Sequence, residues 1–217
     1  MHWNARLLGK TDLYLILDTQ VCGYDRLFEI LVSAVAGGVN IVQLRDKSGY
    51  PGDMLKFTKE ALKITRHEIP FIINDSVELA AESGADGVHL GQEDGPVKEA
   101  RRILGNARII GRSCQSIEHT RIAQDEGADY IGFGSVFKTL TKPERRPMDL
   151  DVLRGAMTAV DIPLFPIGGI TLDNASEITA LSLRRLAVCR AVCEASDVAG
   201  VVKRFREILD GELIRNS

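Results

Sequence analysis

A short pattern that recurs three times is the feature that most constrains how this 217-residue chain folds. Its copies begin at Gly37, Gly84 and Gly127, and in each copy an apolar segment follows the glycine almost at once. Glycine suits this place because it takes, without strain, the left-handed conformation that ends many helices. The copies are spaced by roughly 45 residues, enough for two pairs of strand and helix. The pattern therefore predicts alternating strands and helices along the chain.

Eight strand–helix pairs fit the chain, because one pair takes roughly 22 to 25 residues. This α/β alternation favours a (β/α)8 TIM barrel over a flavodoxin-like open sheet, which is kept as the alternative. We expect one domain over residues 1–217, with a frayed tail at 212–217. The predicted strands are short and apolar, and comprise Leu13 to Asp18, Val39 to Leu44, Phe71 to Ile73, Gly87 to Leu90, Arg108 to Gly111, Tyr130 to Phe133, Leu164 to Ile167 and Arg185 to Cys189. The predicted helices include Arg26 to Ala36, Gly52 to His67, Ser76 to Ser83, Ser116 to Glu126, Leu150 to Val160 and Val198 to Leu209.

The composition is that of an ordinary globular protein and excludes several classes of function. The net charge is only −3 and the basic residues are scattered, so a broad nucleic-acid-binding surface is not expected. No apolar run reaches the length of a membrane span and no signal peptide is recognisable, so we expect a cytoplasmic protein without membrane contact. The sequence leaves the oligomeric state open, with a homo-oligomer among the options. The four cysteines, expected to be free thiols, are Cys22, Cys114, Cys189 and Cys193.

Polar residues directly after the predicted strands are the candidates for chemistry, because the active site of such a barrel lies at the C-terminal ends of its strands. Arg45, Lys47 and Lys142 together give a concentrated positive site suited to several phosphate oxygens. Alternation along the second strand directs Gln43 and Arg45 to the same side. Ordinary surface salt bridges are the alternative for each basic residue taken alone.

Two carboxylates that follow different strands predict a divalent-cation site. Asp75 and Asp94 would converge on Mg²⁺, which proteins commonly hold beside a phosphate with one or two carboxylates. Helix capping is the alternative for Asp75, because a helix is predicted from Ser76 onwards. Glu93 is a second candidate in place of Asp94.

The seventh predicted strand runs into Gly168 and Gly169, where the backbone can approach a phosphate closely. This is the usual phosphate position in barrels, although a tight turn explains the pair equally well. His89 is expected to be packed at a strand end, with a catalytic role as the less favoured alternative. No Ser/His/Asp arrangement is apparent, which argues against acyl transfer.

Five segments of the chain, taken in order, resemble the motifs of the thiamine phosphate synthase family over nearly its whole length. The segments are Val42 to Lys47, Ile73 to Asp75, Gly87 to Asp94, Thr139 to Lys142 and Pro166 to Ile170. The resemblance implies a transferase that joins a hydroxymethylpyrimidine diphosphate to a thiazole phosphate, with Mg²⁺ as cofactor. The implied products are thiamine monophosphate and pyrophosphate. Loss of diphosphate would come first and give a stabilised pyrimidine-methyl cation.

The resemblance also implies a role for particular residues. Contacts to the pyrimidine diphosphate would come from Gln43, Arg45, Lys47, Asn74 and Lys142, and Mg²⁺ would be held by Asp75 and Asp94. Ser113 would hydrogen-bond the pyrimidine, and the catalytic set would be Arg45, Lys47, Ser113 and Lys142. The thiazole phosphate would be held by Thr139, Thr141, Gly168, Gly169, Cys189 and Arg190.

The sequence departs from the family pattern at several places. Lys138 stands where the family usually has proline, and Arg112 stands where a small aliphatic residue is usual. The eighth strand reads Ala187-Val188-Cys189-Arg190 where a serine typically contacts phosphate, and Arg190 is expected to replace that serine as a stronger phosphate ligand. Leu183-Arg184-Arg185 also replaces the usual Gly-Ala-Asp.

Two alternative functions follow from these departures and from related barrels. A thiazole tautomerase shares the fold and transfers a proton, but it needs neither the basic set nor the carboxylate pair. A catalytically silent phosphate-binding or regulatory barrel would explain the altered eighth strand.

Overall fold

Eight parallel strands close into a barrel in strand order β1 to β8. The structure, a computed structural model, describes residues 8–47, 49–139 and 146–211, so the expected tail at 212–217 lies outside the described ranges. The strands are β1 (Leu13–Asp18), β2 (Ile41–Arg45), β3 (Phe71–Asn74), β4 (Gly87–Leu90), β5 (Ile109–Cys114), β6 (Tyr130–Gly134), β7 (Leu164–Ile167) and β8 (Leu186–Val188). The predicted (β/α)8 barrel is thereby confirmed, and the open flavodoxin-like sheet was the wrong alternative.

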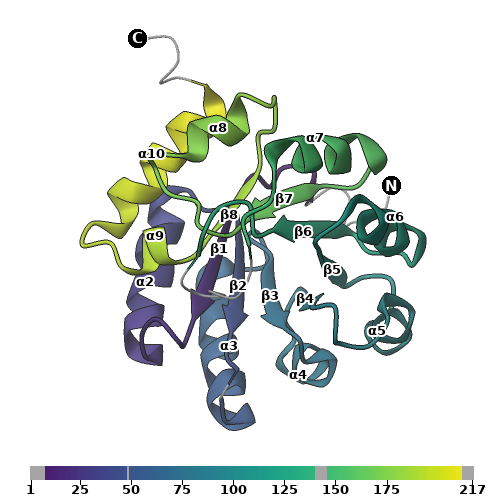
Figure 1. Cartoon of the computed structure of the whole chain (residues 1–217). Coiled ribbons are helices and arrows are strands. Elements are labelled where there is room, and N and C mark those ends of the chain that lie inside the picture. Colours follow the sequence, from purple (N-terminus) through teal and green to yellow (C-terminus); the bar gives the residue numbers. More distant parts are fainter. Residues whose placement is uncertain (1–7, 48, 140–145, 212–217) are drawn as a thin grey trace.

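Helices surround the barrel on its outside, as Figure 1 shows. In chain order they are α2 (Tyr24–Gly37), α3 (Pro51–Thr65), α4 (Val77–Ser83), α5 (Val97–Leu104), α6 (Ile117–Asp125), α7 (Leu150–Ala159), α8 (Ala175–Thr179), α9 (Arg190–Cys193) and α10 (Val198–Asp210). The last of these helices, α10, packs against the first, α2, so the ring of helices closes around the barrel. Within the described ranges, no helix combines the length and the apolar character needed to cross a bilayer.

The alternation of side chains along each strand separates two apolar layers. Side chains such as Leu13 and Leu15 of β1 point outward and pack with the helices. Tyr14 and Ile16 of the same strand point inward and pack with Phe165 of β7 inside the barrel. Strands buried on both faces read as continuous apolar runs, which is why the sequence pattern was informative.

The structure shifts several predicted boundaries. The strands Leu13–Asp18, Gly87–Leu90 and Leu164–Ile167 were predicted with their observed bounds. The fifth strand was predicted to end at Gly111 but continues to Cys114, because Arg112 pairs with both neighbouring strands and Ser113 pairs with β6. The eighth was predicted to include Cys189, which instead precedes the short helix α9.

Asp75 is not the cap of the following helix. Ser76 takes that position, and its hydroxyl accepts a hydrogen bond from the Leu79 backbone N–H at 3.1 Å. The Asp75 carboxylate contacts Lys47 instead. The capping interpretation of Asp75 is therefore wrong, and its side chain is available for another role.

Candidate active site

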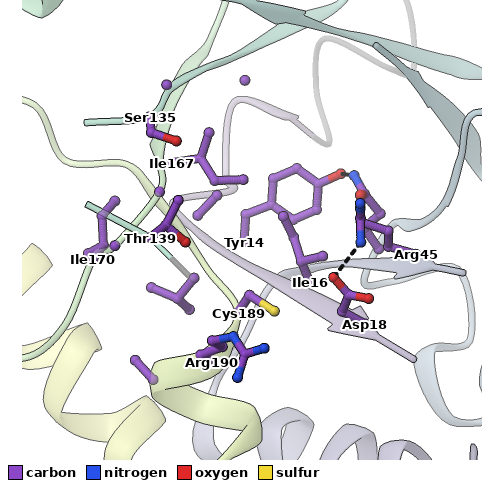
Figure 2. Close-up of a pocket in the computed structure, with 18 of the residues that line it drawn as sticks. Tyr14, Ile16, Asp18, Arg45, Ser135, Thr139, Ile167, Ile170, Cys189 and Arg190 are labelled. Atoms are coloured by element: carbon purple, nitrogen blue, oxygen red, sulfur yellow. Dashed lines mark hydrogen bonds and ion pairs between the residues drawn. The ribbon is translucent and has the colours of Figure 1, made fainter. Parts of the chain in front are cut away.

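A cavity of about 350 Å³ opens at the C-terminal ends of the strands (Figure 2). Its volume lies within the range of small-ligand pockets, and its position is that of the active site in barrels of this architecture. Strands from all around the barrel contribute to it. The polar side chains that line it include those of Asp18, Gln43, Arg45, Asn74, His89, Ser113, Ser135, Lys138, Thr139, Thr171, Cys189, Arg190 and Glu194.

Arg45 is fixed in the cavity wall by a buried carboxylate. Asp18 and Arg45 lie opposite each other on the paired strands β1 and β2, and both side chains point inward. Arg45 Nη1 donates to Asp18 Oδ2 at 2.6 Å and to Gln20 Oε1 at 2.9 Å. The Asp18 side chain is fully buried, while that of Arg45 is 12% exposed. The guanidinium is therefore held in one direction with an edge open toward the cavity.

The rim next to β3 and β4 carries a cluster of opposite charges. Lys47 donates a hydrogen bond to Asp75, and Asp75 and Asp94 are hydrogen-bonded to each other. Burial raises the pKa of Asp75, but the hydrogen bonds with Lys47 and Asp94 outweigh burial and bring that pKa below its ordinary value. Burial and the neighbouring Asp75 raise the pKa of Asp94. Two carboxylates this close together, with an ammonium group beside them, indicate a place that favours positive charge.

The backbone around these two carboxylates has an uncommon conformation at Asp75 and is held by hydrogen bonds. Asp75 has a φ of 66°, an uncommon conformation for a residue other than glycine. Its N–H donates to the His89 carbonyl at 2.8 Å, which ties it to β4. The Asp94 carboxylate accepts from the Gly91 N–H at 2.6 Å. Strain of this kind often occurs at functional sites, because the surrounding structure must hold it in place.

The donor types fit a hard cation such as Mg²⁺, which takes oxygen ligands. Asp75 and Asp94 line a second hollow of about 250 Å³ beside the main cavity, at α4 and α5. Within the described part of the chain, no group of three or more His, Cys, Asp or Glu side chains is arranged to hold a metal. A site of two carboxylates would therefore depend on oxygen atoms from a substrate or from water.

A hydrogen-bonded row of side chains crosses the inside of the barrel below the cavity. Gln43 Nε2 donates to the Tyr14 hydroxyl at 2.6 Å, and this hydroxyl lies 2.7 Å from that of Tyr130. The Tyr130 hydroxyl lies 3.0 Å from His89 Nδ1, and His89 Nε2 lies 2.9 Å from Ser113 Oγ. The row joins five strands and fixes the orientation of both ends, Gln43 and Ser113, which line the cavity.

Gly111 makes room for this row. A Cβ atom at this position would lie 2.1 Å from the Tyr130 ring. Both tyrosines are completely buried, and burial raises the pKa of each hydroxyl well above its ordinary value. These hydroxyls therefore stay protonated and act as hydrogen-bonding groups rather than as bases.

The side of the cavity formed by β7 and β8 consists largely of backbone. Gly168 and Gly169 have φ values of 102° and 65°, which glycine adopts without strain. A Cβ atom at Gly169 would lie 2.2 Å from the Lys138 carbonyl oxygen. The carbonyls of both glycines accept hydrogen bonds from the protein, from Phe137 N–H and from Asn174 Nδ2, each at 2.9 Å. The turn therefore requires glycine for close packing as well as for its conformation.

The short helix α9 follows β8 directly and completes this side. A short helix after the last strand is a recurrent part of phosphate sites in such barrels. Arg190 begins α9 and lines the cavity, but its Nη1 donates to Glu194 one turn further along. The Cys189 thiol is free, and its hydrogen bond with Cys193, together with burial, raises its pKa well above the ordinary value. Cys189 is therefore unsuited to act as a nucleophile at neutral pH.

Comparison with known proteins assigns the chain to a family. The family model described as thiamine monophosphate synthase matches residues 13–192, which include every strand of the barrel. The chain belongs to this family. The thiamine-phosphate synthase of Ruminiclostridium cellulolyticum is 38% identical over 197 residues, covering 90% of this chain and 94% of its own. That of a Synechococcus species is 40% identical over 188 residues, but this chain spans only 53% of its length.

A solved structure supports the same assignment. The thiamine phosphate pyrophosphorylase of Pyrococcus furiosus has a TM-score of 0.85 and 35% identity, covering 96% of this chain and 98% of the other. The likeness to 3-hexulose-6-phosphate synthase, at 16% identity and a TM-score of 0.69, shows the fold alone. The barrel is thus shared widely, whereas the sequence similarity is to the thiamine monophosphate synthase family.

The structure brings together most residues that the sequence singled out. Lining the main cavity are Gln43, Arg45, Asn74, Ser113, Thr139, Gly168, Gly169, Cys189 and Arg190. Asp75 and Asp94 line the second hollow, and Lys47 contacts Asp75. Thr141 and Lys142 lie outside the described residues. His89 is packed at the end of β4 as expected, and its ring also hydrogen-bonds Ser113.

Sequence reasoning missed several residues of the site. Asp18 ends the first predicted strand, so the search of strand ends that found Arg45 could have found it. Tyr14 and Tyr130 lie within strands and give no local signal of their shared hydrogen bond, since 116 positions separate them. Glu194 was missed because helix α9 was not predicted.

Arg112, a departure from the family pattern, hydrogen-bonds the backbone of the loop after β4. Its guanidinium donates to the carbonyl of Gly95 at 2.9 Å and lies 3.5 Å from those of Gln92 and Asp94. It therefore ties the end of β5 to the loop that carries Asp94. Lys138, another departure, is exposed beside the Gly168–Gly169 turn and lines the cavity.

Proposed function

We propose that this protein is a thiamine-phosphate synthase. It would join 4-amino-2-methyl-5-hydroxymethylpyrimidine diphosphate to 4-methyl-5-(2-phosphooxyethyl)thiazole and release pyrophosphate. The observation that carries the proposal is the charged set at neighbouring strand ends: Arg45 lines the cavity, and the contacting residues Lys47, Asp75 and Asp94 lie beside it, with Asp75 directly after the cavity residue Asn74. A tautomerase, which transfers a proton on a thiazole, would require neither the diphosphate-binding cations nor the carboxylate pair. Family membership and the names of the relatives support the same activity.

The reaction breaks the bond between the pyrimidine methylene and the diphosphate oxygen. The thiazole nitrogen then forms a bond to the same methylene, and the electron pair of the broken bond leaves with pyrophosphate. The barrier is lowest when negative charge on the leaving group is neutralised by groups already in place. Arg45 meets that need because Asp18 and Gln20 hold its guanidinium before any substrate arrives.

Lys47 would be the second cation for the diphosphate, with Asn74 as a neutral hydrogen-bonding partner. The Lys47 side chain is 46% exposed at the rim, so its ammonium can move from Asp75 to a phosphate oxygen. Lys142 and Thr141 are proposed for the same substrates from the family motif alone, because they lie outside the described residues.

Asp75 and Asp94 would hold Mg²⁺ beside the diphosphate. The fit rests on the closeness of the two carboxylates, on the oxygen ligands they provide and on the uncommon backbone conformation that presents Asp75. When bound there, Mg²⁺ would supply positive charge to the diphosphate oxygens. Lys47 would then leave its contact with Asp75 and contact the substrate.

The remaining residues would position the two rings. Ser113 and Gln43, fixed at the two ends of the buried row, would hydrogen-bond the pyrimidine. Thr139 and the backbone from Gly168 to Gly169 would hold the thiazole phosphate, together with Cys189 and Arg190 at the start of α9.

The test is incubation of the purified protein with both substrates, with and without Mg²⁺. We expect equal amounts of pyrophosphate and thiamine monophosphate to appear, and none when either substrate is omitted. Tight binding of the thiazole phosphate without product would overturn the proposal and favour a silent binding protein. Isomerisation of a thiazole substrate without any pyrimidine would instead identify a tautomerase.

A further inference from the structure

Arg190 and Glu194 form an ion pair inside the proposed thiazole-phosphate site. Both residues line the main cavity, and both belong to the segment that includes the short helix α9 and its end. Arg190 Nη1 donates to Glu194 Oε1, one helical turn apart. A carboxylate is an unusual lining for a site that must accept a phosphate, because like charges repel.

The Arg190 side chain is incompletely satisfied in this arrangement. Its Nε is buried and has no hydrogen-bond partner among the residues that the structure describes. A buried donor without a partner is unfavourable, and a guanidinium offers its Nε and Nη groups together to a tetrahedral anion. Figure 2 shows Arg190 beside Cys189 at the edge of the cavity, where a ligand could reach it. The contact with Glu194 therefore leaves the hydrogen-bonding capacity of this guanidinium incompletely used, and Arg190 lines the cavity where an anionic ligand would bind.

Glu194 can leave the pair at little cost. Its side chain is 54% exposed and that of Arg190 is 31% exposed, so water can replace the contact. Partly exposed ion pairs of this kind contribute little to stability, although they fix the direction of the side chains. The pair is consequently better suited to control where the guanidinium points than to stabilise α9.

We infer that Glu194 competes with the substrate phosphate for Arg190 and thereby sets how strongly this site binds a phosphate. The inference rests on the proposed function, since it deepens the role of the thiazole-phosphate side. Without a ligand, Glu194 neutralises Arg190 and keeps its guanidinium beside the cavity. A dianionic phosphate that contacts the glycine turn and Arg190 together displaces the carboxylate, whereas a weakly charged ligand does not. Glu194 is thus a specificity-determining residue that acts through Arg190.

The test is a double-mutant cycle with calorimetric titration of 4-methyl-5-(2-phosphooxyethyl)thiazole and, separately, of inorganic phosphate. Glu194→Gln should tighten binding by up to about fivefold, because it removes the competitor and keeps the shape of the side chain. Arg190→Met should weaken binding by about tenfold while it retains the apolar stem. In the Arg190→Met background, Glu194→Gln should have no further effect. In steady-state kinetics the change should fall on the KM for the thiazole phosphate rather than on kcat.

A matched control is Asp151→Asn, which breaks the exposed Arg154–Asp151 pair of 2.6 Å on α7, away from the cavity lining. It should leave the phosphate affinity and both kinetic constants unchanged. Unchanged or weaker binding in Glu194→Gln overturns the inference, and so does an equal gain in the Arg190→Met background. If the wild-type protein makes no thiamine monophosphate, the proposed function fails, yet the inorganic phosphate titration still decides this inference.

Discussion

The two sides of the cavity differ in the groups that they present to the proposed substrates. The side formed by β2, β3 and β4 presents charged side chains to the proposed diphosphate. The side formed by β7 and β8 presents a glycine turn and a short helix to the proposed thiazole phosphate. Arg45 on the first side is held by a fully buried Asp18. Arg190 on the second side is held by the exposed Glu194. The comparison indicates that one side is organised in advance by buried charges, whereas the other adjusts its charge when the ligand arrives.

Arg45→Ala should have the largest effect, because it removes the preorganised cation and leaves Asp18 buried without its partner. We expect kcat/KM to fall by at least about 100-fold. The free energy of unfolding should fall by about 3–5 kcal/mol. Chemical denaturation and initial rates measure the two effects. Arg45→Lys keeps the charge and should recover much of the stability but little of the rate; full recovery of the rate would contradict the need for a fixed guanidinium.

Asp94→Asn should have the next largest effect, because it removes one of the two proposed cation ligands at almost constant shape. The Mg²⁺ concentration for half-maximal activity should rise by about tenfold or more, while the melting temperature changes little. Titration with Mn²⁺ followed by electron paramagnetic resonance measures the same loss without turnover. Glu93→Gln is the matched control on the neighbouring residue. An equal loss in that control would assign the ligand to Glu93 instead.

Gly169→Ala tests the backbone side. The added Cβ would lie 2.2 Å from the Lys138 carbonyl and would require a φ of 65°. We expect a loss of about 1–3 kcal/mol in the free energy of unfolding and a higher KM for the thiazole phosphate. Gly127→Ala is a suitable control, since its φ is also positive, at 91°, and no atom lies within 4 Å of the added Cβ. Equal kinetic effects of the two substitutions would show that the turn does not contribute to binding.

Arg112→Ala should have the smallest effect, since its guanidinium hydrogen-bonds the backbone of the loop that carries Asp94 rather than Asp94's carboxylate. We expect the Mg²⁺ requirement to rise by about threefold, with the KM for the thiazole phosphate unchanged. Arg112→Lys should restore part of the metal affinity because an ammonium can reach one of the carbonyls. An effect on the thiazole phosphate instead would show that the two sides of the cavity are not independent.

The sequence predicted the barrel well because strands buried on both faces leave continuous apolar runs, and because strand ends collect the polar residues. It placed Gln43 and Arg45 on one side of β2, as observed. It failed for the end of β5, where polar Arg112 and Ser113 extend the strand. The pairing of Arg112 with β4 and β6, and of Ser113 with β6, outweighs their local preference. The capping interpretation of Asp75 failed because Ser76 competes for the same helix end.

The sequence by itself determined the order of strands and helices and the family motifs at the strand ends, since both depend on residues close together in the chain. Only the tertiary structure decided the partners of those residues. Tyr14 and Tyr130 meet because closure of the barrel brings β1 and β6 across from each other, and Asp18 meets Arg45 through the register of β1 and β2. Arg190 meets Glu194 because the chain turns into a helix directly after β8. Contacts of this kind depend on backbone geometry over long distances or on an unpredicted helix, and no local pattern specifies them.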